Sequence, residues 1–129
     1  RRPQGLVVSK GALYQADTEN HAIRKIDLKS KRVTTIAGTG KQGTSRVAKS
    51  LAAKSTPLAS PWDVAFHPDE DNLVIAMAGT HQLWSLDLEN ARISVIAGSG
   101  VESISDGVQT DNTLSQPSGL SSLLGSLYF

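Results

Sequence analysis

Short apolar runs alternate with turn-forming segments along the chain. Each run holds about four to six apolar or β-branched residues, and the segments between them are rich in Pro, Gly, Asp and Asn. Runs of this length bounded by turn-formers are typical of β strands. In the middle of the chain, the pattern predicts four short strands at Trp62–Phe66, Leu73–Met77, Leu83–Leu86 and Ile93–Ala97.

The same pattern occurs twice, because residues 13–40 align with residues 73–100 without a gap. Ten of the 28 aligned pairs are identical, among them His21/His81 and Asp27/Asp87, and most others exchange similar residues. A shorter marker, in which Pro opens the first strand of a unit, occurs three times, at Pro3, Pro61 and Pro117. Each unit is therefore a structural repeat.

Repeats of four antiparallel strands predict an all-β fold, a partial β-propeller with two four-stranded antiparallel blades and the start of a third. A two-repeat β-sandwich would explain the short strands but not the Pro-led repeat. The predicted division is a first blade at 1–40, a second at 61–100, the start of a third at 117–129, and inter-blade loops at 41–60 and 101–116. Residues 46–54 are the closest approach to a helical pattern, and a loop is expected there rather than a short surface helix.

Composition narrows the possible functions. The 129 residues carry a net charge of +1, which gives no overall attraction to nucleic acid or membranes, and the longest apolar run, 73–78, is too short to span a bilayer. The absence of cysteine excludes disulfides and thiolate metal sites. Gly38-Thr39-Gly40 and Gly98-Ser99-Gly100 lack the following Lys-Ser/Thr of a phosphate loop, so we expect turns with positive φ.

The segment Ala16-Asp17-Thr18-Glu19-Asn20-His21-Ala22-Ile23, together with the Pro-x-Gly-Leu strand opening, resembles the NHL-repeat family. The second unit keeps His81 but has Met77 for the Asp and Thr80 for the Asn. The order of motifs is most similar to the members that join a thioredoxin-like domain to an NHL propeller. That resemblance implies a cytosolic, scaffold-like protein whose full-length chain adds the remaining blades and a thioredoxin-like domain, and no Cys-x-x-Cys of such a domain is present here.

Propeller topology predicts which residues share a face. In an antiparallel meander, the turn between the second and third strands lies at the same end as the connection to the next blade. Because function concentrates on loops held by a rigid scaffold, this loop-bearing face is the candidate binding face. Its tentative residues are Asp17, His21, Lys41, Arg46, Trp62, Asp63 and His81.

His21 and His81 could be a metal or acid–base pair, but their equivalent positions favour a structural hydrogen bond to neighbouring backbone. Asp17 is expected to accept backbone N–H groups of its turn. Trp62 and Asp63 could contact a ligand at the channel, although inter-blade packing and turn capping are favoured, and Trp84 is expected to be an inter-blade or surface aromatic residue.

The two long loops carry opposite charge. The first holds Lys41, Arg46, Lys49 and Lys54, and the second holds Glu102, Asp106 and Asp111. They could form paired binding patches, but solvated loops whose charges offset each other are the favoured interpretation.

Three functions remain open. A non-catalytic protein-interaction scaffold in the cytosol, without cofactor or metal and with protein partners, is favoured. A propeller hydrolase or lyase would need His, Asp or Glu converging from several blades, and RNA binding would need a basic face. We also expect that the isolated chain is not a well-behaved monomer, because propeller blades bury their faces against neighbours.

Overall fold

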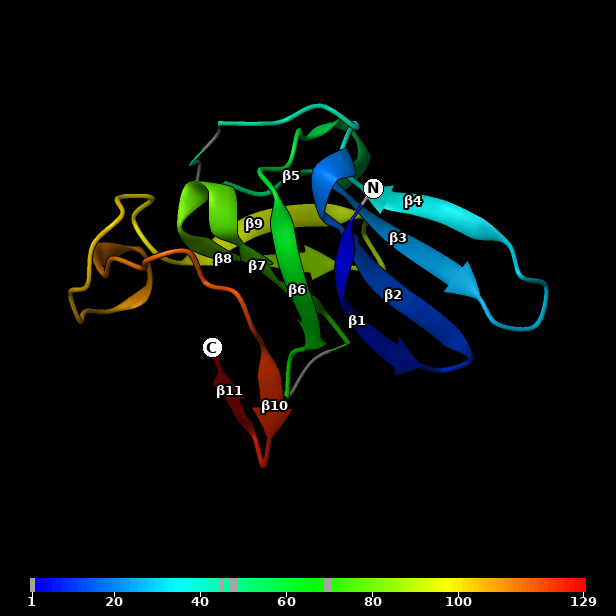
Figure 1. The fold of residues 1–129 in the computed structure, drawn as a ribbon. Helices are drawn as coiled ribbons and strands as arrows, with labels where there is room; N and C mark the ends of the chain where they lie inside the picture. The colour runs from blue at the N-terminus through cyan, green and yellow to red at the C-terminus, as the bar shows by residue number, and fades with distance from the viewer. Residues whose placement is uncertain (1, 45, 47–48, 69–70) are drawn as a thin grey trace.

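A computed structural model of the chain describes residues 2–44, 46, 49–68 and 71–129. Its first sheet is an antiparallel meander in the order β1-β2-β3-β4 (Figure 1). The bounds are Pro3–Ser9 for β1, Ala12–Asp17 for β2, Ala22–Asp27 for β3 and Val33–Ala37 for β4.

The second sheet has five strands in the order β5-β9-β8-β7-β6. Four of them repeat the first meander, and β5 adds a short outer edge through the pairing of Leu51 with Ile93 and of Ala52 with Arg92. The bounds are Leu51–Ala52 for β5, Pro61–Phe66 for β6, Leu73–Met77 for β7, Gln82–Asp87 for β8 and Arg92–Ala97 for β9.

A third, two-stranded sheet pairs β10 (Ser121–Leu123) with β11 (Ser126–Tyr128). The fold is therefore the predicted all-β partial propeller, with two antiparallel blades and the start of a third. The four strands predicted in the second unit are confirmed to within one residue at each end. The limits proposed for the blades and loops stay a prediction.

The long connections contain more structure than a loop. The predicted loop 41–60 includes β5 and the 3-10 turn η2 (Ala53–Ser55), while 101–116 includes η4 (Gln109–Asp111). In the segment 46–54, the described residues contain β5 and the start of η2 and form no α-helix. Residues 45, 47 and 48 lie outside the described part. Two further 3-10 turns, η1 (Thr18–Asn20) and η3 (Ala78–Thr80), connect the second and third strands of each blade.

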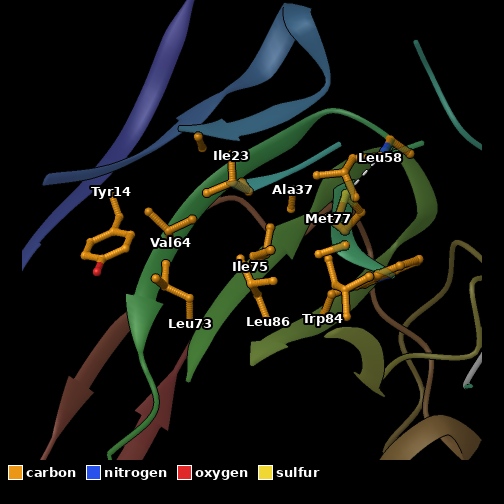
Figure 2. Close-up of a cluster of buried hydrophobic side chains, with 14 of the residues drawn as sticks. Tyr14, Ile23, Ala37, Leu58, Val64, Leu73, Ile75, Met77, Trp84 and Leu86 are labelled. Atoms are coloured by element: carbon orange, nitrogen blue, oxygen red, sulfur yellow. Dashed lines mark hydrogen bonds between the residues drawn. The ribbon is translucent and has the colours of Figure 1, made fainter. Parts of the chain in front are cut away.

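The main hydrophobic core lies between the first two blades (Figure 2). Ile23 and Ala37 of the first blade meet Leu73, Ile75 and other apolar side chains of the second, and all four are fully buried. Every residue of β7 is buried, because the second blade is covered on both faces. A smaller cluster of Val74, Ala76 and Leu83 on its other side packs against Leu127 of the third sheet and Leu120, which precedes that sheet.

Trp84 belongs to the main core between the first two blades and is only 1% exposed. Its Nε1–H donates to Oε1 of Gln82 at 3.2 Å, and the Gln82 amide in turn donates to the Gly98 carbonyl at 3.1 Å. Trp84 was expected to be either an inter-blade or a surface aromatic residue, and it lies between the blades. Within the described residues, no helix is long and apolar enough to cross a membrane.

Candidate functional site

The candidate binding face is the end of the blades that carries η1, η3 and the long connections. Backbone hydrogen bonds join the connection to both blades, from Gly38 N–H to the Ala53 carbonyl and from Gly79 N–H to the Ala59 carbonyl, each at 3.0 Å. Figure 1 shows η1 and residues 41–44 together at the top, opposite the β1–β2 and β10–β11 turns. The described part of the first connection therefore shares an end of the blades with η1 and η3.

His21 and His81 make the same contact in successive blades. The Ser60 N–H donates to Nδ1 of His21 at 3.1 Å, and the Gln116 N–H donates to Nδ1 of His81 at 3.3 Å. Each acceptor nitrogen must be unprotonated to receive this bond. The predicted structural bond to neighbouring backbone is therefore present in both blades, and it ties each η turn to the start of the next blade.

The residues that donate these bonds share an unusual backbone. Ser60 and Gln116 each precede a blade-opening Pro and have φ of 50° and 43°, and Arg2, before Pro3, has φ of 44°. Non-glycine residues occupy this region infrequently, so its recurrence marks a repeated structural device. Sequence reasoning did not identify Ser60 or Gln116, although their position before the repeated Pro was the available signal.

Asp17 is largely buried beneath η1, and its carboxylate accepts side-chain donors. Nε of Arg24 lies 2.9 Å from Oδ2, and the Asn20 amide lies 2.9 and 3.0 Å from the two oxygens. Asp17 makes no side-chain capping bond to η1, so the expectation of backbone N–H donors from the turn was wrong. The Asn20 amide and the Arg24 guanidinium fill that role.

The surroundings of Asp17 favour its charged form. Burial raises the pKa of this carboxyl, but hydrogen bonds that include those from Arg24 and Asn20 outweigh burial and hold the pKa below its usual 3.8. Arg24 also donates to the Thr35 hydroxyl on β4. The Asp17–Arg24 pair thus links three strands of the first blade.

Asp63 joins the inner strands of three consecutive units. Its Oδ1 accepts the Val64 N–H at 2.8 Å, and its Oδ2 accepts the Leu120 N–H of the third unit at 2.7 Å. A Cβ placed on Gly5 would lie 1.7 Å from Oδ1 and 2.5 Å from Cα of Asp63. The carboxylate therefore occupies the space that a side chain on β1 would need, and it connects blades rather than capping a turn.

Trp62 lies half-buried in a register irregularity of β6, between the pairs Pro61–Met77 and Asp63–Ala76. β1 has a corresponding irregularity between Pro3 and Leu6. β-bulges of this kind redirect side chains at the edges of sheets. Next to Trp62, the Pro61 carbonyl accepts the Thr18 hydroxyl at 2.8 Å, a contact that sequence reasoning also missed.

The charged loops are exposed on this face. Lys41, Arg46, Lys49 and Lys54 are exposed, and so are Glu102, Asp106 and Asp111. The Arg46 side chain lies where a Cβ on Gly100 would stand, with its Cδ 2.5 Å away, so the first loop reaches the Gly-Ser-Gly turn that follows the last strand of the second blade. Among the described residues, no ion pair joins a base of the first loop to an acid of the second, and Glu102 lies 4.0 Å from Nε2 of His81.

The Gly-Thr-Gly and Gly-Ser-Gly segments are turns, as expected, with φ between 81° and 93° at their glycines. Within the described ranges, no group of three or more His, Asp or Glu side chains is arranged to hold a metal ion. The structure thus brings His21, His81, Asp17 and Asp63 into separate hydrogen-bonding roles.

The Pro-led strands, the repeated His turns and the stacked antiparallel sheets together define a segment of an NHL-type β-propeller. Over 92% of its length the chain is 40% identical to human NHL repeat-containing protein 2 and 42% identical to the protein of that name from Gallus gallus. Over 93% of its length it is 43% identical to the protein SUPPRESSOR OF QUENCHING 1, chloroplastic, of Arabidopsis thaliana. These matches confirm the resemblance drawn from the motifs.

The chain spans 19% of the length of the NHL repeat-containing proteins and 12% of the length of the Arabidopsis protein. A solved structure of a Bacteroides thetaiotaomicron protein of unknown function superimposes with a TM-score of 0.70, covering 84% of this chain and 26% of that one. At 21% identity, this likeness supports the fold alone. No protein-family model matches the chain.

Proposed function

We propose that this chain is a non-catalytic part of a propeller that acts as a protein-interaction scaffold. The binding surface is the face formed by η1, η3 and the connections 41–60 and 101–116. The names of the similar proteins describe no enzymatic reaction. No arrangement within the described residues favours a hydrolase, a lyase or an RNA-binding surface, and the net charge of +1 offers RNA little attraction.

The observation that carries this proposal is a hydrogen-bonded base beneath exposed charged loops. Hydrogen bonds from Ser60 to His21 and from Gln116 to His81 hold the base between blades. Above it, bases such as Lys41 and Arg46 remain exposed. A pre-organised scaffold lowers the entropic cost of binding, while exposed charges steer and select a partner.

The test is charge reversal in the intact protein that carries this chain. Lys41, Arg46 and Lys49 are changed together to Glu, and partners are compared by quantitative proximity labelling and by affinity of each purified partner. The matched control changes Lys29, Lys31 and Arg32 to Glu, because these bases lie at the opposite end, around the β3–β4 turn. We expect reduced association with at least one partner in the first variant alone. Unchanged binding in both variants would contradict the proposal.

We extend the proposal to the parent protein. By its similarity to NHL repeat-containing protein 2, we propose that the full-length chain adds the remaining blades and a thioredoxin-like domain and acts in the cytosol. The chloroplastic name of the Arabidopsis relative makes location a direct test. Sequencing the full reading frame and fractionating cells would decide both points, and a plastid or organelle-targeted protein would contradict the cytosolic location.

A further inference from the structure

A cavity between the first two blades lies at the opposite end of the blades from the loop-bearing face. It has a volume of about 610 Å³ and opens between the β1–β2 turn, the start of β7 and the β8–β9 turn. Both of its walls belong to this chain, because one blade supplies Ser9 and Lys10 and the other supplies residues 87–89. The side chains used below are Lys10, Tyr14, Phe66, Asp71, Asp87 and Glu89.

The cavity has an excess of negative charge. Lys10 Nζ lies 2.6 Å from Oδ2 of Asp71, so this lysine neutralises one carboxylate across the gap between blades. Two further carboxylates, Asp87 and Glu89, line the same cavity, and its described lining residues hold no lysine or arginine besides Lys10. The lining therefore retains two uncompensated negative charges, and Lys10 already shows that an ammonium group fits against this wall.

Asp87 is held in a fixed position and stays charged. The backbone N–H of Asn90 donates to Oδ1 at 2.9 Å and its side-chain amide donates to Oδ2 at 2.8 Å, and the Glu89 N–H also donates to Oδ1 at 2.9 Å. Hydrogen bonds from the backbone and side chain of Asn90 lower the pKa of Asp87 below its usual 3.8. Oδ1 thus accepts two N–H groups, whereas Oδ2 accepts one and keeps a lone pair for a further donor.

The floor of the cavity carries a hydroxyl group that makes no hydrogen bond to the described residues. Tyr14 is 7% exposed, and its ring meets that of Phe66 edge-on, with centroids 5.4 Å apart and planes at 89°. Its hydroxyl has no hydrogen-bond partner among the described residues, and Figure 2 shows it directed away from the other labelled core side chains. The hydroxyl oxygen is not one of the buried polar atoms that lack a partner, so it is open to the cavity and available to a ligand.

The ring itself is a poorer recognition element than the hydroxyl. Nζ of Lys25 already lies 5.8 Å from the centroid of Tyr14, and Phe66 covers another side. Recognition therefore falls to oxygen acceptors, namely the Tyr14 hydroxyl and the carboxylates of Asp87 and Glu89. A group of acceptors with excess negative charge is complementary to a cationic hydrogen-bond donor.

We propose that this inter-blade cavity binds an arginine or lysine side chain presented by a partner protein. The donors of the cation would contact Glu89 and Asp87 at the rim and the Tyr14 hydroxyl at the floor. This site lies at the other end of the blades from the loop-bearing face, so it is a second interaction site that goes beyond the proposed function. Its success or failure does not depend on Lys41, Arg46 or Lys49.

The test uses the intact protein that carries this chain, with two peptide probes. Acetyl-Gly-Arg-Gly-amide carries the cation, and the matching citrulline peptide has nearly the same shape without charge. In NMR titrations, we expect the arginine peptide to shift the amides of Lys10, Tyr14 and Glu89, and to bind at least about tenfold more tightly than the citrulline peptide. Added salt should weaken its binding. Free arginine is the third probe, and it tests whether the cavity is a site for a small-molecule cation. Tighter binding of free arginine than of the arginine peptide would overturn the assignment to a partner protein.

Two conservative variants locate the contact. Glu89→Gln and Tyr14→Phe should each weaken binding of the arginine peptide by about twofold to tenfold, because each removes one hydrogen-bonding or charged group. Asp106→Asn and Tyr128→Phe are matched controls on exposed residues outside the cavity, and they should leave binding unchanged. Equal affinity for both peptides, shifts confined to the loop-bearing face, or no loss in either cavity variant would overturn the proposal.

Discussion

At the scale of single residues, two histidines serve as backbone acceptors rather than as chemical groups. Nδ1 of His21 and of His81 each receive the N–H of the residue before a blade-opening Pro. Both histidines also have positive φ, at 47° and 53°. The repeat made this structural role predictable, because equivalent positions in neighbouring blades do the same work. The donors were not predictable, since a contact 39 or 35 residues away depends on how the blades are stacked.

The two histidines provide controls for each other. In the intact protein, His21→Ala should speed hydrogen exchange of the Ser60 amide and leave the Gln116 amide unchanged, while His81→Ala should do the reverse. Loss of one such bond, with its donor left unsatisfied, costs about 1–3 kcal/mol, which corresponds to an exchange rate roughly fivefold to 150-fold faster where opening is local. Equal acceleration of both amides in either variant would indicate general loosening rather than the two specific bonds.

Among the strands, β1 and β6 and the segment leading into β10 form the inner contacts, and Asp63 connects them. Asp63 stands at the position that Gly5 and Gly119 occupy in the other Pro-led strand openings, but its role could not be predicted from the sequence. The structure explains the difference, because one carboxylate occupies the space beside Gly5 and accepts the Leu120 N–H. β5 was missed for another reason, since two residues are too few to produce an alternating pattern.

The inner contact can be tested with two equivalent glycines. Gly5→Ala should lower the free energy of unfolding of the intact protein by about 1–3 kcal/mol or more, because the new Cβ would meet both the backbone and the carboxylate of Asp63. Gly119→Ala is the matched control, since a Cβ there meets nothing within 4 Å. Urea unfolding monitored by circular dichroism gives both values. Similar stability in the two variants would mean that β1 and β6 can separate at no cost.

The β3–β4 and β8–β9 turns have equivalent aspartates. The Ser30 backbone N–H and hydroxyl donate to Asp27, and the backbone and side chain of Asn90 donate to Asp87. These bonds lower the pKa of each carboxyl below 3.8, the value expected in the unfolded chain. A depressed folded pKa contributes stability that is fully present above 3.8 and is lost as pH falls through the folded value. NMR titration of the carboxyl carbons should give both pKa values below 3.8, and values at or above it would contradict the turn bonds.

At the scale of the whole molecule, the first two blades present equivalent faces to different surroundings. Val64 and Ile93 on the second blade are 2% and 1% exposed against the first blade. The aligned residues of the first blade, Leu6 and Val33, are 53% and 59% exposed. The fold class was predictable from the repeat alone, because each unit has the same strand pattern. The aligned repeats already show a polar residue, Arg24, in the first blade where the second blade has Trp84. That this difference marks an outward face could not be predicted, because the order in which the blades stack is not visible in the sequence.

This outward face leads to the prediction that the isolated chain self-associates. Leu6, Val8 and Val33 leave apolar surface on one side, and Leu123, Leu124 and Phe129 leave more on the third sheet. Sheets that expose apolar faces and unpaired edges tend to pair with other molecules. In sedimentation velocity, the isolated chain should form concentration-dependent oligomers, and the combined change Leu6→Gln, Val8→Thr and Val33→Thr should shift it toward monomer. Ile104→Gln, at a loop residue that is 90% exposed, is the control and should have little effect. A monomer with a sharp melt that does not depend on concentration would show that two blades and a partial third already form a self-sufficient unit.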